Sequence, residues 1–423
     1  MFKNIKQIFS PSNKDVRNKI LFTLLILFIY KVGTAVRVPG TDNITEDLGF
    51  LELLNVMGGG SLKNFSIFAL GVTPYISASI IVQLLQMDII PYFSNLSKEG
   101  HTGRVKLNKI TRYLGIALAF LQGLVMSFSF LGETATAIEY LRVSLILTAG
   151  TCFLLWLGDQ ITRKGVGNGI SMLIMAGILI STPSMMVDAF SSFVVTGTVQ
   201  EVAFGVTKFI LFLLIYIAII VGVVFIEKSE RRVPIQYTNR TSTAYGAKQT
   251  YIPFKLNSAG VMPVIFASSL ISIPSLIAAF IKNDNFSLFI NRYINYSTVT
   301  GFILYILLIV LFSYLYTFMA SGLKPKELAE NLNKNGGYIP GIRPGGETKE
   351  YISKVLSRIT FLGAVFLVVI ACLPILVSNF SSLPTSVTVG GTGLLIVVGV
   401  ALETYNQIES TLSARKYERS YRK

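Results

Sequence analysis

The sequence predicts an all-α membrane protein whose ten transmembrane helices form two inverted, pseudo-symmetric halves of five. The first observation is composition: the 423 residues are 52% hydrophobic and only 14% charged, whereas about a quarter of the residues in a soluble protein are charged. The second is that apolar residues cluster in blocks of roughly 17–25, the length that crosses a bilayer core. The third is a short motif that occurs once in each half of the chain.

Ten apolar blocks along the chain fit transmembrane spans. The second block follows the glycine run Gly58–Gly60, and the fifth follows the run Gly-Val-Gly-Asn-Gly at 165–169, so these two are the least regular. Glycine weakens a helix and permits backbone conformations that other residues avoid. The approximate centres of the ten predicted spans are residues 28, 76, 120, 150, 178, 217, 269, 310, 367 and 399.

The Lys and Arg residues are divided unevenly between the two sides of these spans. Thirty of the 37 lie in the N-terminal segment, in the alternate loops on the same side, or in the C-terminal tail. Because Lys and Arg are retained on the cytoplasmic side of a membrane, the sequence predicts that both termini are cytoplasmic.

Two of the predicted cytoplasmic loops, at about 227–256 and 322–354, are longer than topology requires. Both are basic, which predicts a docking surface for an acidic or nucleic-acid-rich partner. The alternative is that these charges only fix the topology and contact anionic lipid.

The repeated motif occurs as A-L-G-V-T-P-Y-I-S-A-S around Gly71 and as S-A-G-V-M-P-V-I-F-A-S around Gly260, with the two glycines aligned. Each copy begins the second span of a five-span half. An odd number of spans per half forces the halves into opposite orientations, and such inverted repeats place a functional site near the midplane. The alternative is coincidence among the small residues that membrane helices favour.

Several classes of active site are excluded by residue content. His101 is the one histidine, so a zinc site of the H-E-x-x-H type cannot form. The chain has no G-x-x-x-x-G-K phosphate loop, and its two cysteines, Cys152 and Cys372, fall inside apolar blocks. We therefore expect no catalytic residue, no metal site and no cofactor, and the chain is predicted not to be an enzyme.

Two functions fit an inverted repeat: a secondary transporter of a small solute, and a passive pore. A transporter needs polar groups at the midplane, but Asp159 and Glu403 lie toward the cytoplasmic ends of spans. Isoleucines occupy the span middles instead, with Ile76 and Ile80 one helical turn apart. Ordinary core or lipid-facing packing is the alternative role for each isoleucine.

Five runs of sequence carry a family resemblance: SIFALGVTPYISASIIVQLLQMDIIP, WLGDQITRKGVGNGIS, AGVMPVIFASS, GGYIPGIRPGGET and GGTGLLIVV. Together, in this order, they resemble the bacterial SecY family, the main subunit of the protein-conducting channel of the plasma membrane. The resemblance implies a passive channel for unfolded secretory polypeptides that also releases membrane segments sideways into lipid. It implies no small-molecule substrate. The partners it implies are the subunits SecE and SecG, the motor ATPase SecA, the ribosome with its nascent chain, signal sequences and membrane lipid.

The resemblance also assigns roles to individual residues. A half-helix plug at about 54–66 closes a central hourglass pore, and the membrane helix of span two starts near Phe68. A lateral gate opens between span two (with three) and span seven (with eight). The plug residues are Leu54, Gly58, Gly59, Gly60, Ser61, Leu62 and Phe65. The pore ring is Val72, Ile76, Ile170, Ile174, Ile265 and Ile396. The gate residues are Ser77, Ser79, Gln83, Ser268 and Ser269. Docking of SecA or the ribosome falls to Arg231, Arg232, Arg240 and Arg343.

The chain is accordingly divided into five segments. The predicted boundaries are a cytoplasmic segment at 1–19, a first half at 20–190, an external hinge loop at 191–206, a second half at 207–409 and a cytoplasmic tail at 410–423.

Overall fold

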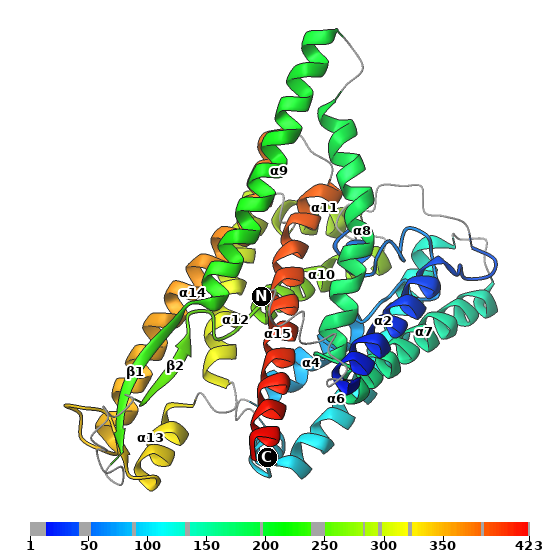
Figure 1. The fold of residues 1–423 in the computed structure, drawn as a ribbon. Coiled ribbons are helices and arrows are strands. Elements are labelled where there is room, and N and C mark those ends of the chain that lie inside the picture. The colour runs from blue at the N-terminus through cyan, green and yellow to red at the C-terminus, as the bar shows by residue number, and fades with distance from the viewer. Residues whose placement is uncertain are drawn as a thin grey trace.

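The computed structural model describes residues 14–41, 52–86, 90–131, 136–194, 198–237, 250–281, 284–294, 298–319, 324–381 and 385–421. All ten predicted span centres fall inside helices (Figure 1). These helices are α2 (Lys14–Ala35), α4 (Thr73–Leu85), α6 (His101–Phe130), α7 (Ala137–Lys164), α8 (Gly169–Phe193), α9 (Val199–Lys228), α10 (Met262–Ile281), α12 (Val299–Met319), α14 (Gly346–Ser381) and α15 (Thr385–Tyr421). Shorter helices are α3 (Glu52–Met57), α5 (Pro91–Lys98), α11 (Asp284–Tyr293) and α13 (Pro325–Lys334).

Within the described residues, seven helices are long and apolar enough to cross a membrane. Helix α4 is shorter: its 13 residues extend about 20 Å, less than a hydrocarbon core of about 30 Å. The irregular segment 58–72 precedes it. Such backbone is tolerated at membrane depth only where protein surrounds it or where it lines a watery cavity.

The predicted start of span two near Phe68 is wrong, because the helix begins at Thr73. Gly71 has a left-handed backbone with φ of 57°, and Pro74 in the first turn fits a helix start. The predicted plug helix is also shorter than expected. It ends at Met57, since two left-handed glycines, with φ of 72° and 79°, follow in the turn at 59–60.

The predicted external hinge loop at 191–206 is mostly helical. Helix α8 continues to Phe193 and α9 already begins at Val199. The early start follows from a capping box, in which the Glu201 carboxylate accepts a hydrogen bond of 2.9 Å from the Thr198 amide. The predicted tail at 410–423 likewise continues α15 as far as Tyr421.

The helices pack as two groups that meet at a shared core. Helix α6 packs against α4 and α7, whereas α12 packs against α10 and α14. Helix α15 contacts α3, α8, α9 and α14, and it runs through the middle of the view in Figure 1. The largest apolar cluster draws buried residues from both halves.

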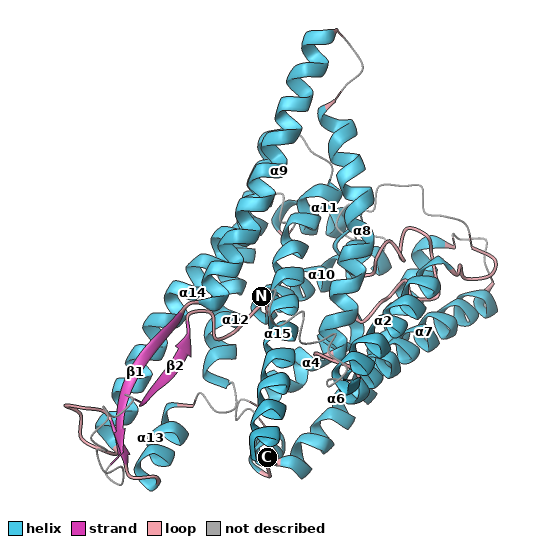
Figure 2. Ribbon diagram, viewed as in Figure 1, coloured by secondary structure: helices cyan, strands magenta, loops and turns pink. Residues whose placement is uncertain are grey.

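A small antiparallel sheet joins the two large loops, which the sequence did not predict. Its order is β2 (Thr250–Lys255), β1 (Glu230–Tyr237), β3 (Gly337–Tyr338), and Figure 2 shows β1 and β2 beside α13 and α14. Val233 and Phe254 lie in one buried cluster with Leu332 and Leu356 from the second loop and α14. The two loops therefore form a single folded body.

Candidate functional site

The six residues of the predicted pore ring lie in one apolar cluster. Five are buried, with 7% or less of each residue exposed, and Ile170 is half-buried. They come from the start of α4, from α8, from α10 and from α15, so both halves of the chain contribute. This cluster thus includes residues more than 300 positions apart in the sequence, such as Val72 and Ile396.

Matched backbone geometry places two of these isoleucines. At the start of α4, the Val72 carbonyl accepts a hydrogen bond of 3.1 Å from the Ile76 amide. At the start of α10, the Val261 carbonyl accepts one of 3.3 Å from the Ile265 amide. Ile76 and Ile265 therefore stand in the same turn of two equivalent helices, as the repeated motif predicts.

The turn before α8 holds that helix against two others. The Val166 amide donates to Thr23 Oγ1 of α2 at 3.1 Å, and the Gly167 amide donates to Gln407 Oε1 of α15 at 2.8 Å. These bonds satisfy backbone amides that would otherwise be unpaired at a helix end. They fix the start of α8, where the first ring residue of that helix lies.

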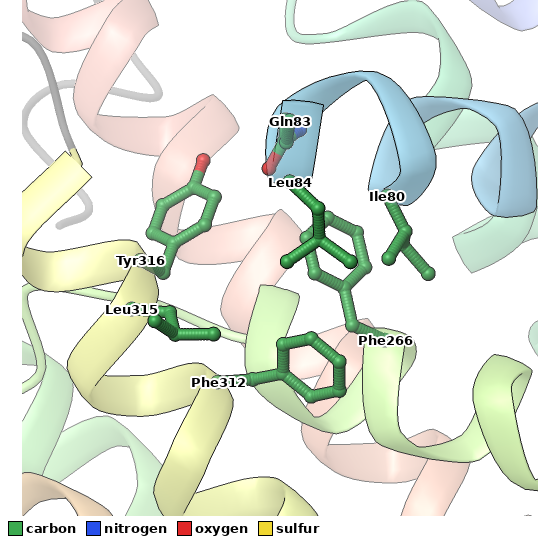
Figure 3. Close-up of a pocket in the computed structure, with 7 residues that line it drawn as sticks. All are labelled: Ile80, Gln83, Leu84, Phe266, Phe312, Leu315 and Tyr316. Atoms are coloured by element: carbon green, nitrogen blue, oxygen red, sulfur yellow. The ribbon is translucent and has the colours of Figure 1, made fainter. Parts of the chain in front are cut away.

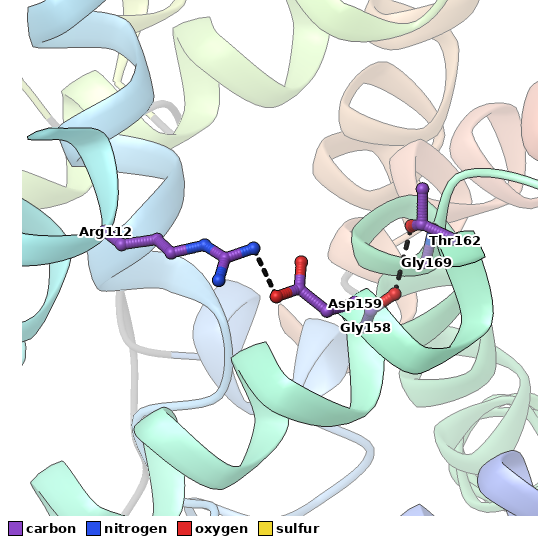
Figure 4. Close-up of polar contacts among 5 residues, drawn as sticks. All are labelled: Arg112, Gly158, Asp159, Thr162 and Gly169. Atoms are coloured by element: carbon purple, nitrogen blue, oxygen red, sulfur yellow. Dashed lines mark hydrogen bonds and ion pairs between the residues drawn. The ribbon is translucent and has the colours of Figure 1, made fainter. Parts of the chain in front are cut away.

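The end of α7 is tied both to α8 and to α6. Thr162 Oγ1 donates to the Gly158 carbonyl at 3.0 Å and accepts from the Gly169 amide at 2.9 Å. A side chain on Gly169 would overlap the Gly158 carbonyl oxygen, so glycine permits this close approach. Asp159 forms an ion pair with Arg112 of α6, as Figure 4 shows.

The predicted plug segment extends from the apolar cluster that holds the predicted ring residues to a second apolar cluster. Val56 and Met57 belong to the same cluster as the ring. Leu62 and Phe65 are buried against α6 and α7 in the second cluster. Gly58 and Gly59 are buried, Gly60 is half-buried, and the side chain of Leu54 lies outside the described residues. Ser61 is buried, and its hydroxyl has no partner within the described part of the chain.

The plug segment is also folded on itself. The Asn55 side chain accepts a hydrogen bond of 3.0 Å from the Lys63 amide, and the Asn55 carbonyl accepts one of 2.8 Å from the Gly60 amide. The segment is therefore a compact turn.

The five predicted gate residues lie on α4 and α10, two helices that contact each other. Gln83 donates to Ser79 within α4 at 3.1 Å, and Ser268 donates to the carbonyl one turn earlier in α10 at 2.8 Å. Ser77 and Ser269 are buried, and the Ser77 hydroxyl is without a partner among the described residues. The side-chain hydrogen bonds of Ser79, Gln83 and Ser268 described here thus stay within their own helices.

A small cleft lies between α4 and the pair α10 and α12. The Phe266 ring makes edge contacts with Phe312 and Tyr316, at centroid distances of 5.8 and 6.3 Å. Figure 3 shows these rings facing α4 across the cleft. Of this lining the sequence points to Gln83 as a gate residue and to Ile80 as a midplane isoleucine, whereas the aromatic residues of an apolar span carry no distinguishing signal. The lining is Ile80, Gln83, Leu84, Phe266, Phe312, Leu315 and Tyr316.

The predicted docking arginines differ in their surroundings. Arg231 and Arg232 are exposed on β1. Arg232 pairs with Glu230 at 2.7 Å and lies 4.7 Å from the centre of the Tyr251 ring. The hydrogen bond to Glu230 raises the pKa of Arg232 above its ordinary value. Arg240 lies outside the described residues.

Arg343 is exposed in the turn before α14 and is held through its backbone. Its amide lies 3.4 Å from a Glu347 carboxylate oxygen, and its carbonyl accepts a hydrogen bond of 2.8 Å from Thr348. Its guanidinium forms no ion pair within the described ranges. This fixed backbone presents a cation to solvent.

The described residues contain no group of three His, Cys, Asp or Glu side chains close enough to hold a metal ion. The features that the structure does assemble are an apolar cluster with residues from both halves, a compact turn at 55–63 next to it, and a mainly apolar cleft between α4 and the pair α10 and α12. These arrangements suit passage of a chain better than chemistry on a small molecule.

Comparison with known proteins agrees with this geometry. The family model described as SecY matches residues 66–405. The chain is 46% identical to the protein translocase subunit SecY of Staphylococcus aureus (strain NCTC 8325), over 96% of each chain.

Solved structures share the fold at lower identity. One described as a protein-conducting channel has a TM-score of 0.68 at 19% identity, covering 93% of this chain and 92% of the other. A second, described in terms of a SecY plug domain that stabilises the closed channel, has a TM-score of 0.65 at 20% identity, with the same coverage. A third, Sec61 in the canine ribosome–channel complex from the endoplasmic reticulum, has a TM-score of 0.65 at 19% identity, again with that coverage. The identity to the staphylococcal protein and the extent of the family match show that this chain belongs to the SecY family.

Proposed function

We propose that this chain is the pore-forming subunit of a bacterial protein translocase. It passes unfolded secretory polypeptides across the plasma membrane and releases membrane segments sideways into lipid. Its relatives are named as translocase subunits. The observation that carries the proposal is that the six predicted ring side chains, from both halves, lie in one apolar cluster.

The proposed ring works as a seal because its side chains are branched, apolar and packed from several helices. A hydrated ion that enters loses water and finds no polar partner, which is unfavourable. A narrow apolar constriction can also expel water altogether. An extended polypeptide passes by displacing flexible side chains, so the seal is independent of the sequence that moves.

In the proposed mechanism the plug at 54–66 covers the ring until a substrate arrives. The family member with a solved plug structure is described as maintaining a membrane seal through that segment. The cleft between α4 and the pair α10 and α12 is where the lateral gate opens. Its apolar lining, from Ile80 to Tyr316, matches the apolar core of a signal sequence, which gains free energy from leaving water.

The proposed partners act at the basic face. SecA or the ribosome docks on the folded body of the two large loops, near Arg231, Arg232, Arg240 and Arg343, and both termini lie on this cytoplasmic side. One fold relative is described in a ribosome–channel complex. SecE and SecG complete the assembly. The chain itself performs no catalytic step, so movement is driven by these partners.

A small-solute transporter, the alternative open at the level of sequence, is not supported. The relatives are translocase subunits. Asp159, a carboxylate toward the end of a predicted span, is paired with Arg112 between α6 and α7. No observation favours a second function.

Reconstitution tests the proposal directly. The full chain with SecE and SecG in proteoliposomes, supplied with SecA, ATP and a preprotein, is expected to move the preprotein to a protease-protected lumen. Protection should vanish without ATP or without this chain. If protection does not depend on this chain while the vesicles take up a small solute saturably, the proposed function is wrong.

A further inference from the structure

Two buried hydroxyl groups connect membrane helices to the backbone of the plug segment. The Tyr30 hydroxyl of α2 donates to the Gly58 carbonyl at 3.0 Å. The Ser181 hydroxyl of α8 lies 3.1 Å from the Val56 carbonyl. Both residues are buried, with 2% and 8% of their surfaces exposed.

Both groups of the contact between the Ser181 hydroxyl and the Val56 carbonyl have a second hydrogen-bond partner. The Ser181 hydroxyl also lies 3.0 Å from the Ile178 carbonyl of its own helix. The Val56 carbonyl also accepts a hydrogen bond of 3.1 Å from the Gly59 amide. Breaking the contact between them therefore leaves neither group unpaired.

Neither group of the hydrogen bond between the Tyr30 hydroxyl and the Gly58 carbonyl has a second partner in the described ranges. Within the part of the chain that the structure describes, the Tyr30 hydroxyl contacts no second acceptor and the Gly58 carbonyl receives no second donor. A buried polar group that loses its one partner incurs its full desolvation penalty. Separation of these two groups is therefore costly until water reaches them.

The position of the Tyr30 ring is fixed by its neighbours. The ring stacks on Phe68, with 6.0 Å between centroids and 14° between planes. The Tyr30 oxygen lies 3.0 Å from the place where a Gly177 side chain would begin. The hydroxyl thus points into the narrow space where α2, α8 and the plug meet.

We propose that Tyr30 is a positioning residue that latches the plug in its seated state through the Gly58 carbonyl. This inference rests on the proposed function, because it assumes that 54–66 is a movable plug. When the plug leaves, the Gly58 carbonyl enters a water-filled funnel and gains water as a partner. Loss of the hydroxyl therefore destabilises the seated state more than the displaced state.

Tyr30→Phe removes the latch with little other change, since the ring and its stacking on Phe68 remain. The variant should shift the equilibrium toward the displaced plug by about tenfold, the usual effect of one buried hydrogen bond. Ser181→Ala is the matched control, because the Val56 carbonyl keeps the Gly59 amide as a donor. The control should change the equilibrium less than about twofold.

The measurement is ion conductance of the full chain, reconstituted with SecE and SecG in planar bilayers without preprotein. Tyr30→Phe is expected to raise the fraction of open time about tenfold over the native chain. Melting temperature in detergent should fall somewhat more for Tyr30→Phe than for Ser181→Ala, because only Tyr30→Phe leaves a buried carbonyl without its donor. A fall in melting temperature without a rise in open time would mark a merely structural role.

Deletion of residues 58–65 in the same assay tests the plug itself. If the deletion raises conductance and Tyr30→Phe does not, the latch is refuted and the proposed plug stands. If the deletion leaves conductance unchanged, both the latch and the plug assignment fail. Equal effects of Tyr30→Phe and Ser181→Ala on open time would also refute the latch.

Discussion

Gly71 and Gly260, which lie 189 positions apart in the sequence, adopt the same left-handed backbone conformation, with φ of 57° and 62°. Each stands two residues before the first residue of a membrane helix, Thr73 of α4 or Met262 of α10. The repeated motif is therefore repeated in backbone geometry as well. Because α4 and α10 also contact each other, the two copies frame the predicted gate and start the helices that carry Ile76 and Ile265.

Replacing either glycine with alanine should destabilise the protein through backbone strain alone. An added methyl at Gly260 would have no neighbour within 4 Å, and one at Gly71 would only reach the Gly58 Cα at 4.0 Å. A side chain in the left-handed region costs about 1–2 kcal/mol, and each variant should lose this much unfolding free energy, measured by thermal unfolding in detergent.

Gly222→Ala in α9 is the control for this pair, since it also has open space but lies inside a helix without a positive φ. It should be neutral or slightly stabilising. A loss at Gly222 equal to that at Gly71 would contradict the assignment of the cost to backbone conformation.

The spans could be predicted from the sequence because few backbone conformations are stable inside a bilayer. Backbone polar groups in hydrocarbon must be paired within the chain, so an apolar block of sufficient length becomes a helix. All ten predicted centres lie in helices for this reason. The repeat around Gly71 and Gly260 was also visible, because a left-handed turn selects glycine.

Features that depend on distant partners were missed. The β1 strand reads Glu-Arg-Arg-Val-Pro-Ile-Gln-Tyr, with Val233 and Ile235 buried alternately. That alternation is a strand signal, but it involves only two buried apolar positions in a basic loop. The bond from Tyr30 to Gly58 joins residues 28 positions apart, and no local pattern encodes such a contact.

The ion pair between Arg112 and Asp159 should be modestly stabilising. Their side chains are 41% and 28% exposed, so solvent screens the pair, and Asp159→Asn should lower the unfolding free energy by about 1 kcal/mol. The pair holds α6 to the end of α7. The charge-swapped double variant, Arg112→Asp with Asp159→Arg, should recover part of the loss, and a double-mutant cycle in thermal unfolding measures the coupling. If the losses of unfolding free energy in the single variants Arg112→Asp and Asp159→Arg simply add in the double variant, the two side chains do not interact.

Arg343 should matter more for partner binding than Arg232. The Arg232 guanidinium is already bonded to Glu230 and lies over Tyr251, whereas Arg343 presents its charge on a fixed turn. Arg343→Gln should weaken binding of SecA to proteoliposomes by about three- to tenfold and reduce its salt dependence. Arg232→Gln, at a docking arginine whose charge is already paired with Glu230, should weaken binding less, by about twofold. Equal losses in both variants would indicate a diffuse charge effect without a specific site.

The seal should depend on the apolar character of the ring rather than on its exact shape. Ile76 and Ile265 occupy equivalent turns of α4 and α10, and both are buried in the shared cluster.

Replacing both with asparagine places amide groups at the constriction, where they bind water and offer partners to an ion. Ion leak through planar bilayers should rise by about tenfold or more, since an apolar barrier to a hydrated ion is lowered by each polar partner. The control, Ile76→Leu with Ile265→Leu, keeps the constriction apolar and should retain the seal. The leucine variant keeps the side chains apolar but changes their shape. A leak in both variants would therefore show that the shape of the side chains, and not their apolar character, closes the pore. If the asparagine variant has the same conductance as the native chain, these two residues do not form the constriction.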